Sequence, residues 1–180
     1  LVPVSTSIET GFALPDVSEF EKYITPRTKG IILCNPGNPT GSLYTKETII
    51  KLGEIVKKHN LFLYSDEVYR EFCYTDEPHF SAMHLEGLEQ NVILLDSVSK
   101  RYSLCGVRIG CIVSKNKDVM GGVLKFAQAR LCSPAYGQIA AEGALATPPE
   151  YFKAVRDEYM KRRDVLIEAL NKMEGVFCPK

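Results

Sequence analysis

The sequence lacks several features that would assign it to a particular class of protein. It has no excess of charge of one sign, because 22 lysines and arginines balance 22 aspartates and glutamates among 180 residues. This balance argues against a nucleic acid or a membrane surface as the partner. No apolar run approaches the roughly 20 residues that a membrane-spanning helix needs, and no repeat or low-complexity segment is present. Small-molecule chemistry is therefore the function class to consider first.

The six cysteines also lack a recognisable pattern. The sequence contains no Cys-x-x-Cys pair and no signal-peptide pattern at its start. A chain of this length with 45% hydrophobic residues can bury a core without disulfide staples. We therefore expect reduced thiols and a cytoplasmic location, and we expect no metal site.

Apolar segments of strand length alternate with helical patterns along the chain. Strands are expected at 28–34, 61–66, 91–96 and 109–114, with a further short strand inside 1–14. Helices are expected at 16–24, 46–59, 116–131, 134–146 and 149–174. This alternation predicts an α/β fold, a three-layer α/β/α arrangement with a mostly parallel sheet. Segment 61–66 is nearly all apolar, which is typical of a parallel strand covered on both faces.

Polar residues follow three of the expected strands. Asn38 comes after the first, Asp66 ends the second, and Ser97 with Lys100 ends the third. Parallel strands place their carboxyl ends at one edge of the sheet, where such folds bind ligands. We therefore expect these side chains to converge on one site.

The stretch 96–110 is the centre of this prediction. Ser97 and Arg108 are suitable donors for a phosphate group, and Lys100 would lie beside that phosphate. A polar loop with a solvated lysine is the alternative interpretation of this stretch alone. If the ligand also carries an aldehyde, Lys100 is placed to condense with it as an imine.

The remaining candidates fit a ring on the same ligand. Asp66 would pair with a ring nitrogen and keep it protonated, which makes the ring an electron sink. Asn38 and Tyr69 would both donate to a ring oxygen. Each residue also has a simpler interpretation: Asp66 as a helix N-cap, Asn38 as a turn residue, Tyr69 as core, and Arg108 as the partner of any acid.

Three sequence blocks resemble the aspartate aminotransferase family, the class I/II aminotransferases of pyridoxal phosphate (PLP) fold type I. They are Asn38-Pro-Thr-Gly41, Ser65-Asp-Glu-Val-Tyr69 and the block from Ser97 to Gly110, in the family's order and spacing. The resemblance implies the large-domain fold of PLP-dependent transferases and PLP as the cofactor.

The resemblance also implies a role for each candidate residue. Lys100 is the Schiff-base lysine and proton shuttle, and Asp66 pairs with the pyridine nitrogen. Tyr69 and Asn38 bond the ring oxygen, while Ser97 and Arg108 bind the phosphate. The sequence departs from the family pattern beside the site, where Val107 replaces a frequent tryptophan and Cys105 replaces a small or hydroxyl residue.

The resemblance covers only the middle of a family member of about twice this length. Residues 1–147 would form the later part of the large PLP-binding domain, and residues 148–180 a long linker helix and the start of the small domain. The family's amino-terminal phosphate loop, its stacking aromatic ring and its carboxylate-binding arginine are not identifiable in the sequence. We therefore expect this segment alone to be inactive and the full protein to be a homodimer.

The expected reaction is transfer of an amino group from an amino acid to a 2-oxo acid. A PLP-dependent lyase, decarboxylase or synthase on the same fold is an alternative, because all of these enzymes form a carbanion at the substrate α-carbon. A non-catalytic PLP-sensing regulatory domain and a plain structural α/β domain are further alternatives. The identity of the amino acid substrate does not follow from these residues.

Overall fold

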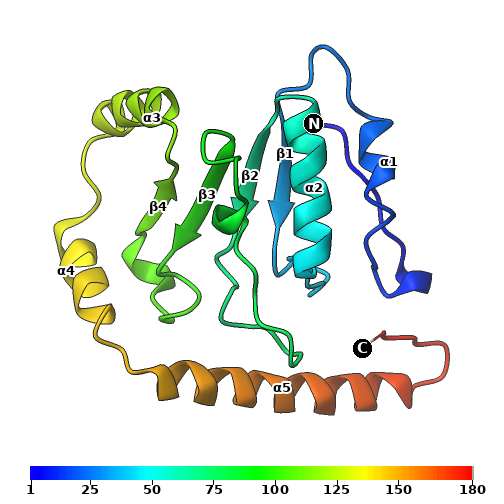
Figure 1. The fold of residues 1–180 in the computed structure, drawn as a ribbon. Coiled ribbons are helices and arrows are strands. Elements are labelled where there is room, and N and C mark those ends of the chain that lie inside the picture. The colour runs from blue at the N-terminus through cyan, green and yellow to red at the C-terminus, as the bar shows by residue number, and fades with distance from the viewer. Residues whose placement is uncertain (180) are drawn as a thin grey trace.

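A four-stranded sheet forms the centre of the molecule (Figure 1). The structure is a computed structural model that describes residues 1–179. The strands lie in the order β1 (Gly30–Cys34), β2 (Phe62–Asp66), β3 (Val92–Ser97) and β4 (Gly110–Val113). The first three are parallel and β4 is antiparallel to β3. The expected α/β fold with a mostly parallel sheet is confirmed.

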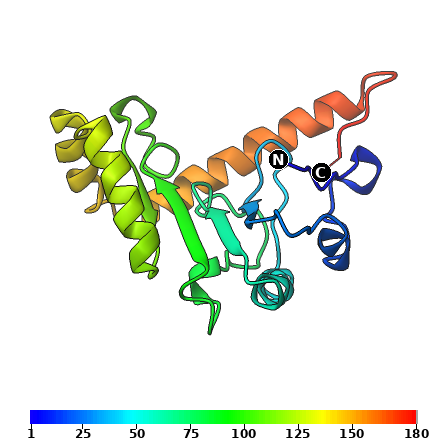
Figure 2. The same ribbon diagram turned by 90° about the horizontal axis from the view of Figure 1, so that it is seen from above.

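Helices connect and flank these strands. The α-helices are α1 (Ser18–Glu21), α2 (Lys46–Lys58), α3 (Lys117–Arg130), α4 (Ala135–Ala144) and α5 (Pro149–Asn171). Short 3₁₀ turns are η1 (Ile8–Thr10), η2 (Ala82–His84) and η3 (Cys105–Val107). Helices α3 and α4 lie together at the β4 end of the sheet, and α1 lies at the opposite end (Figure 2). The elements from residue 28 onward therefore agree with the sequence pattern to within a few residues.

The core lies between α2 and one face of the sheet. Helix α2 presents Ile49, Leu52 and Val56 at helical spacing, and all three are buried. They pack in one cluster with Leu33 of β1 and Leu63 of β2. Burial of these apolar side chains supplies most of the free energy that stabilises the sheet. It therefore also holds in place the strand ends that carry the polar residues.

The other face of the sheet is more open, which corrects one expectation. Strand β2 alternates buried and half-buried residues, so it is not fully covered on both faces. On β1 the alternation is sharper, because Ile31 and Leu33 are buried whereas Ile32 is 62% exposed. Within the described residues, only one face of β2 is therefore covered, although its sequence is nearly all apolar.

The prediction of a strand inside residues 1–14 is wrong. The segment instead forms η1, where the amide of Gly11 donates to the carbonyl of Ile8 and the amide of Phe12 to that of Ser7. Backbone groups used within a turn are not available to a strand ladder. The helix expected at 16–24 is present but short, with only Ser18–Glu21 helical.

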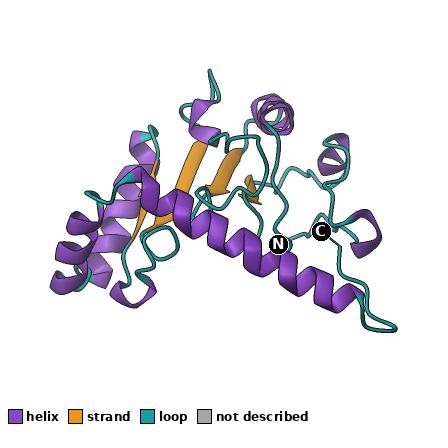
Figure 3. Cartoon of the chain, turned by 90° about the horizontal axis from the view of Figure 1, so that it is seen from below, coloured by secondary structure: helices purple, strands orange, loops and turns teal. Residues whose placement is uncertain are grey.

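Helix α5 crosses the sheet edge at which β1, β2 and β3 end (Figures 1 and 3). Two ring contacts join it to that edge: Tyr159 to Phe72, with centroids 5.7 Å apart, and Phe152 to Tyr102, at 5.6 Å. Both ring pairs are edge-on, which is a favourable aromatic geometry. Within residues 1–179, no helix combines the length and apolar composition that crossing a bilayer requires.

The N-terminus of α2 offers a direct test of the local fold. The hydroxyl of Thr45 accepts a hydrogen bond from the amide of Thr48 at 3.2 Å. Replacing Thr45 with alanine removes this cap, and we expect the free energy of unfolding to fall by about 1 kcal/mol. Urea unfolding of the variant measures this loss, and Thr45→Ser, which keeps the hydroxyl, is the control. Equal stability of Thr45→Ala and the parent protein would contradict the capping role.

Candidate active site

A cavity opens at the carboxyl-end edge of the sheet. It has a volume of about 520 Å³, which is in the range of small-molecule sites. Its lining comes from four parts of the chain: the turn after β1, the segment after β2, the segment after β3, and α5. The lining includes Asn38, Tyr69, Ser99 and Lys100. The fold therefore brings three of the six predicted site residues to one cavity.

Tyr69 contacts both of the other two residues. The amide nitrogen of Asn38 donates to the hydroxyl oxygen of Tyr69 at 3.3 Å. The ammonium nitrogen of Lys100 lies over the Tyr69 ring, 5.5 Å from its centroid. Since the Tyr69 oxygen accepts from Asn38, its own hydrogen is free to donate to a ligand. Asn38 lies in a turn, and its side chain also lines the cavity.

Aromatic side chains form another wall of the cavity. Phe72, Tyr74 and Tyr159 line it, and the guanidinium of Arg163 lies 5.2 Å from the centroid of the Tyr74 ring. Burial raises the pKa of the Tyr74 hydroxyl, so this side chain stays uncharged near neutral pH. The sequence pattern did not assign these residues to the site, because their contribution depends on how α5 crosses the sheet.

The other three predicted residues are not among those that line the cavity. Asp66 and Ser97 are the last residues of β2 and β3, so they end at the same sheet edge. The Ser97 hydroxyl accepts from the amide of Ser99 at 3.2 Å. Arg108 is exposed, has a left-handed φ of 57°, and donates to the carbonyl of Cys105 at 2.9 Å.

Asp66 does not cap a helix, so that alternative is wrong. No helix follows β2 directly, and one carboxylate oxygen of Asp66 accepts from the amide of Val68 at 3.2 Å in a tight turn. This turn directs the chain from the strand end to Tyr69. The second carboxylate oxygen of Asp66 takes no part in this bond.

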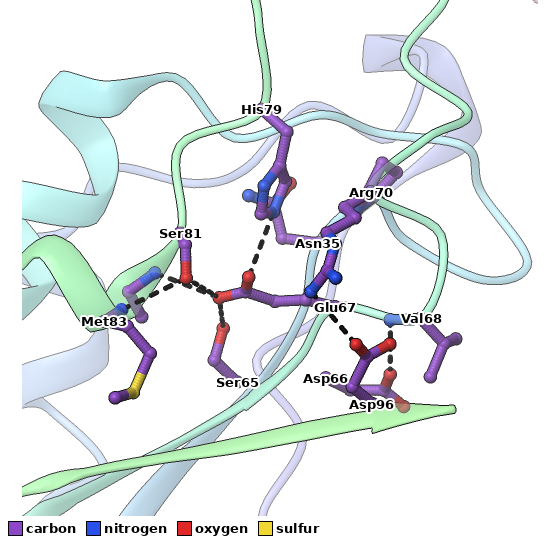
Figure 4. A network of polar contacts seen from close by, with 12 residues as sticks. Asn35, Ser65, Asp66, Glu67, Val68, Arg70, His79, Ser81, Met83 and Asp96 are labelled. Atoms are coloured by element: carbon purple, nitrogen blue, oxygen red, sulfur yellow. Dashed lines mark hydrogen bonds and ion pairs between the residues drawn. The ribbon is translucent and has the colours of Figure 1, made fainter. Parts of the chain in front are cut away.

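Glu67 is a buried acid that the sequence analysis did not single out. Its side chain is 1% exposed, and one carboxylate oxygen accepts three hydrogen bonds (Figure 4). The donors are the hydroxyl of Ser65 at 2.9 Å, the hydroxyl of Ser81 at 3.0 Å and the amide of Ala82 at 2.9 Å. Glu67 therefore ties the turn between Asp66 and Tyr69 to the distant segment at η2. An acid directly after Asp66 was the only sequence signal for it.

His79 lies against the second carboxylate oxygen of Glu67, with 3.7 Å between its Nε2 and Glu67 Oε2 (Figure 4). Burial lowers the pKa of His79 below its ordinary value, against the opposing charge of Glu67. Arg70 also lowers this pKa and Glu71 raises it. A buried imidazole with a lowered pKa stays neutral where the unfolded chain would take up a proton.

This environment predicts a pH dependence of stability. Above a pH of about 6.5, His79 is neutral in both the folded and the unfolded chain. Below it, protonation favours the unfolded chain, so the free energy of unfolding falls as the pH drops. We expect urea unfolding at pH 7.5, 6.5 and 5.5 to show a smaller decrease for His79→Gln than for the parent. Identical decreases in the two proteins would contradict this assignment.

The chain is similar to known proteins in both sequence and structure. The family model described as aminotransferase class I and II matches residues 2–180. The chain belongs to the class I and II aminotransferase family. A putative aminotransferase of Bacillus subtilis, YugH, is 33% identical over 98% of this chain and 45% of its own length. The glutamate-pyruvate aminotransferase AlaA of Escherichia coli is 32% identical over 92% of this chain and 42% of its own length.

Solved aminotransferase structures share the fold. An aromatic aminotransferase from Pyrococcus horikoshii aligns with a TM-score of 0.85 and 33% identity, over 96% of this chain and 47% of that protein. An aspartate aminotransferase from Thermotoga maritima aligns with a TM-score of 0.84 and 28% identity, over 97% of this chain and 45% of that protein. This aminotransferase-family chain therefore spans slightly less than half the length of the relatives that it matches.

The residues that line the cavity, together with Arg108 outside its lining, fit the cofactor that the family resemblance implies. A primary amine, a free hydroxyl hydrogen on Tyr69 and the Asn38 amide meet at one cavity. Arg108 has five N–H donors, of which one is used on Cys105, so most remain for an anion. Amine, ring-oxygen donors and anion donors are the three kinds of group that an aldehyde-bearing, phosphorylated ring requires.

Proposed function

We propose that this chain is the central part of a PLP-dependent aminotransferase of about twice its length. The observation that carries the proposal is the placement of the Lys100 amine beside the hydrogen-bonded Tyr69 and Asn38 pair at the sheet edge. The reaction transfers an amino group from an amino acid to a 2-oxo acid. When bound, PLP supplies an aldehyde and an electron-withdrawing ring.

Each site residue has a role in this proposal. Lys100 would hold the cofactor through its amine, and the same amine would take up the proton from the substrate α-carbon. Asp66 holds the proton on the ring nitrogen with a carboxylate at the end of β2. Tyr69 donates its free hydrogen to the ring oxygen. Asn38 orients the Tyr69 hydroxyl through their hydrogen bond and also donates to the same ring oxygen.

Ser97 and Arg108 bind the phosphate in this proposal. Both lie at the β3–β4 end of the site, where Ser97 is opposite Gly110 in the strand register. The planar guanidinium suits bidentate contact with phosphate oxygens. Binding requires Arg108 to aim its remaining donors at the ligand while it keeps or releases the carbonyl of Cys105.

The test is an assay of the longer protein, loaded with PLP, against a panel of amino acids with 2-oxoglutarate or pyruvate as acceptor. Stoichiometric formation of a new amino acid and a new 2-oxo acid supports aminotransfer. Release of ammonia, a thiol or carbon dioxide instead would identify a lyase, decarboxylase or synthase on this fold. PLP binding without turnover of any substrate would favour a regulatory domain.

The organisation of the longer protein is part of the proposal. Residues 1–147 form the later part of the large PLP-binding domain, and residues 148–180 form the linker helix and the start of the small domain. Helix α5 supports this division, since it begins at Pro149 and none of its residues is buried.

We propose a homodimer in the cytoplasm. Six free cysteines are consistent with a reducing compartment, and light scattering tests the dimer.

A further inference from the structure

A second polar network lies beside the candidate site and is centred on Asp96. Both carboxylate oxygens of Asp96 accept from Nη2 of Arg101, and Nη1 of Arg70 lies 3.0 Å from Asp96 Oδ2. The amide of Ser97 also donates to Asp96 at 2.8 Å. A single carboxylate at the end of β3 thus holds two arginines from different segments (Figure 4 shows Arg70 and Asp96).

The pair of Asp96 and Arg101 is largely shielded from water, whereas Arg70 is 31% and Glu71 35% exposed. The side chain of Asp96 is 13% exposed and that of Arg101 is 7% exposed. Glu71 adds a second acid, with its Oε1 3.9 Å from Arg101 Nη1 and 3.7 Å from Arg70 Nε. Two acids therefore balance two arginines. The shielded Asp96–Arg101 pair is screened far less than a surface pair, so it restricts the loop that it closes most strongly.

The chain positions of the two arginines give this network its consequence. Arg70 directly follows Tyr69, and Arg101 directly follows Lys100. The pairing of Asp96 with Arg101 closes the short loop 96–101 that carries Lys100. The pairing with Arg70 ties that loop to the turn that carries Tyr69. The 5.5 Å between the Lys100 ammonium and the Tyr69 ring centroid is the distance that both ties restrict.

We propose that Asp96 is a positioning residue that holds Lys100 against Tyr69 by binding the two arginines that follow them in the chain. It rests on the proposed function for the identity of Lys100 as the reacting amine. Asp96 acts through Arg70 and Arg101 and does not itself touch substrate or cofactor. An amine held in one place reacts faster with a bound aldehyde, because misplacement by an ångström can lower a rate about 10²-fold.

The experiment uses the longer protein without cofactor. An amine-selective acylating reagent labels the lysines, and mass spectrometry gives the labelling rate of Lys100 relative to exposed Lys125 in the same sample. The variant is Asp96→Asn, which keeps the shape and removes the charge. Asp76→Asn, an exposed loop position, is the matched control. We expect the relative labelling rate of Lys100 to rise severalfold in Asp96→Asn and to stay at the parent value in Asp76→Asn.

A second measurement follows covalent capture of PLP on Lys100, trapped with borohydride. We expect Asp96→Asn to slow capture roughly 10-fold, and Asp96→Glu to recover part of the rate. PLP affinity measured in a Lys100→Ala background separates positioning from damage to the pocket, because positioning of Lys100 leaves that affinity unchanged. If Asp96→Asn lowered PLP affinity in the Lys100→Ala background by the same factor as it slowed capture, the proposal would be overturned.

Arg70→Gln keeps the proposal testable if Asp96→Asn does not fold. It removes the tie between Asp96 and the Tyr69 turn, together with the contact to neighbouring Glu71, at a side chain that is 31% exposed. We expect faster Lys100 labelling there too. Parent-level labelling of Lys100 in a folded variant of either kind would refute the positioning role. Since labelling needs no cofactor or substrate, absence of aminotransfer in the parent protein would count against the proposed function and leave this test intact.

Discussion

Replacing Lys100 with alanine is expected to abolish covalent attachment of PLP and to lower the aminotransfer rate by at least about 10³-fold. Proton transfer by a positioned side chain alone contributes roughly 10²- to 10⁴-fold, and this variant also removes the amine that bonds the cofactor. The loss follows from the placement of the Lys100 amine at the cavity, over the Tyr69 ring. The fold should be retained, because the side chain of Lys100 is only half-buried.

The measurement combines borohydride trapping with mass spectrometry and an assay of 2-oxo acid formation. Lys125→Ala is the matched control, since Lys125 is exposed on α3. We expect this control to retain both the trapped adduct and the activity. Covalent PLP retained on the Lys100→Ala protein at a different lysine would show that another residue is the reacting amine.

Replacing Glu67 with alanine is expected to destabilise the fold by about 3 kcal/mol or more, because a buried donor left without a partner costs about 1–3 kcal/mol. The variant removes the acceptor of three donors: the hydroxyls of Ser65 and Ser81 and the amide of Ala82. Ser65 and Ala82 are themselves buried, so water does not readily replace the carboxylate there. The turn that carries Tyr69 is expected to loosen together with the segment at η2.

Two further variants sharpen this prediction. Glu67→Gln keeps an acceptor oxygen for the same donors, so we expect a smaller loss of about 1 kcal/mol. Glu54→Ala on the exposed face of α2 controls for loss of an acid in general. Urea unfolding monitored by circular dichroism gives the free energies. If Glu67→Ala were as stable as Glu54→Ala, the network around Glu67 would not contribute to the fold.

The sequence by itself determined the fold class and most of the element boundaries. Apolar segments of strand length and helices with Ile49, Leu52 and Val56 at three- and four-residue spacing are local signals, so they can be seen without a structure. The same locality explains the errors. Residues 1–14 carry no period, and the local hydrogen bonds of η1 decided their conformation.

Residue type and order pointed to six residues for the site, and three of them line the cavity. Asn38, Tyr69 and Lys100 meet there because parallel strands end at one edge. Asp66 ends its strand at that edge, yet the turn it forms with Val68, rather than a helix, became clear only in the structure.

Only the tertiary structure decided how the candidate site is supported. Glu67 and Asp96 bind partners that are fourteen residues away in one case and twenty-six in the other, as Ser81 and Arg70 show. No local pattern marks such pairs, since either acid could be a solvated surface charge in the sequence. Burial is what selects their partners, because a charge removed from water must be compensated by whichever groups the fold brings beside it.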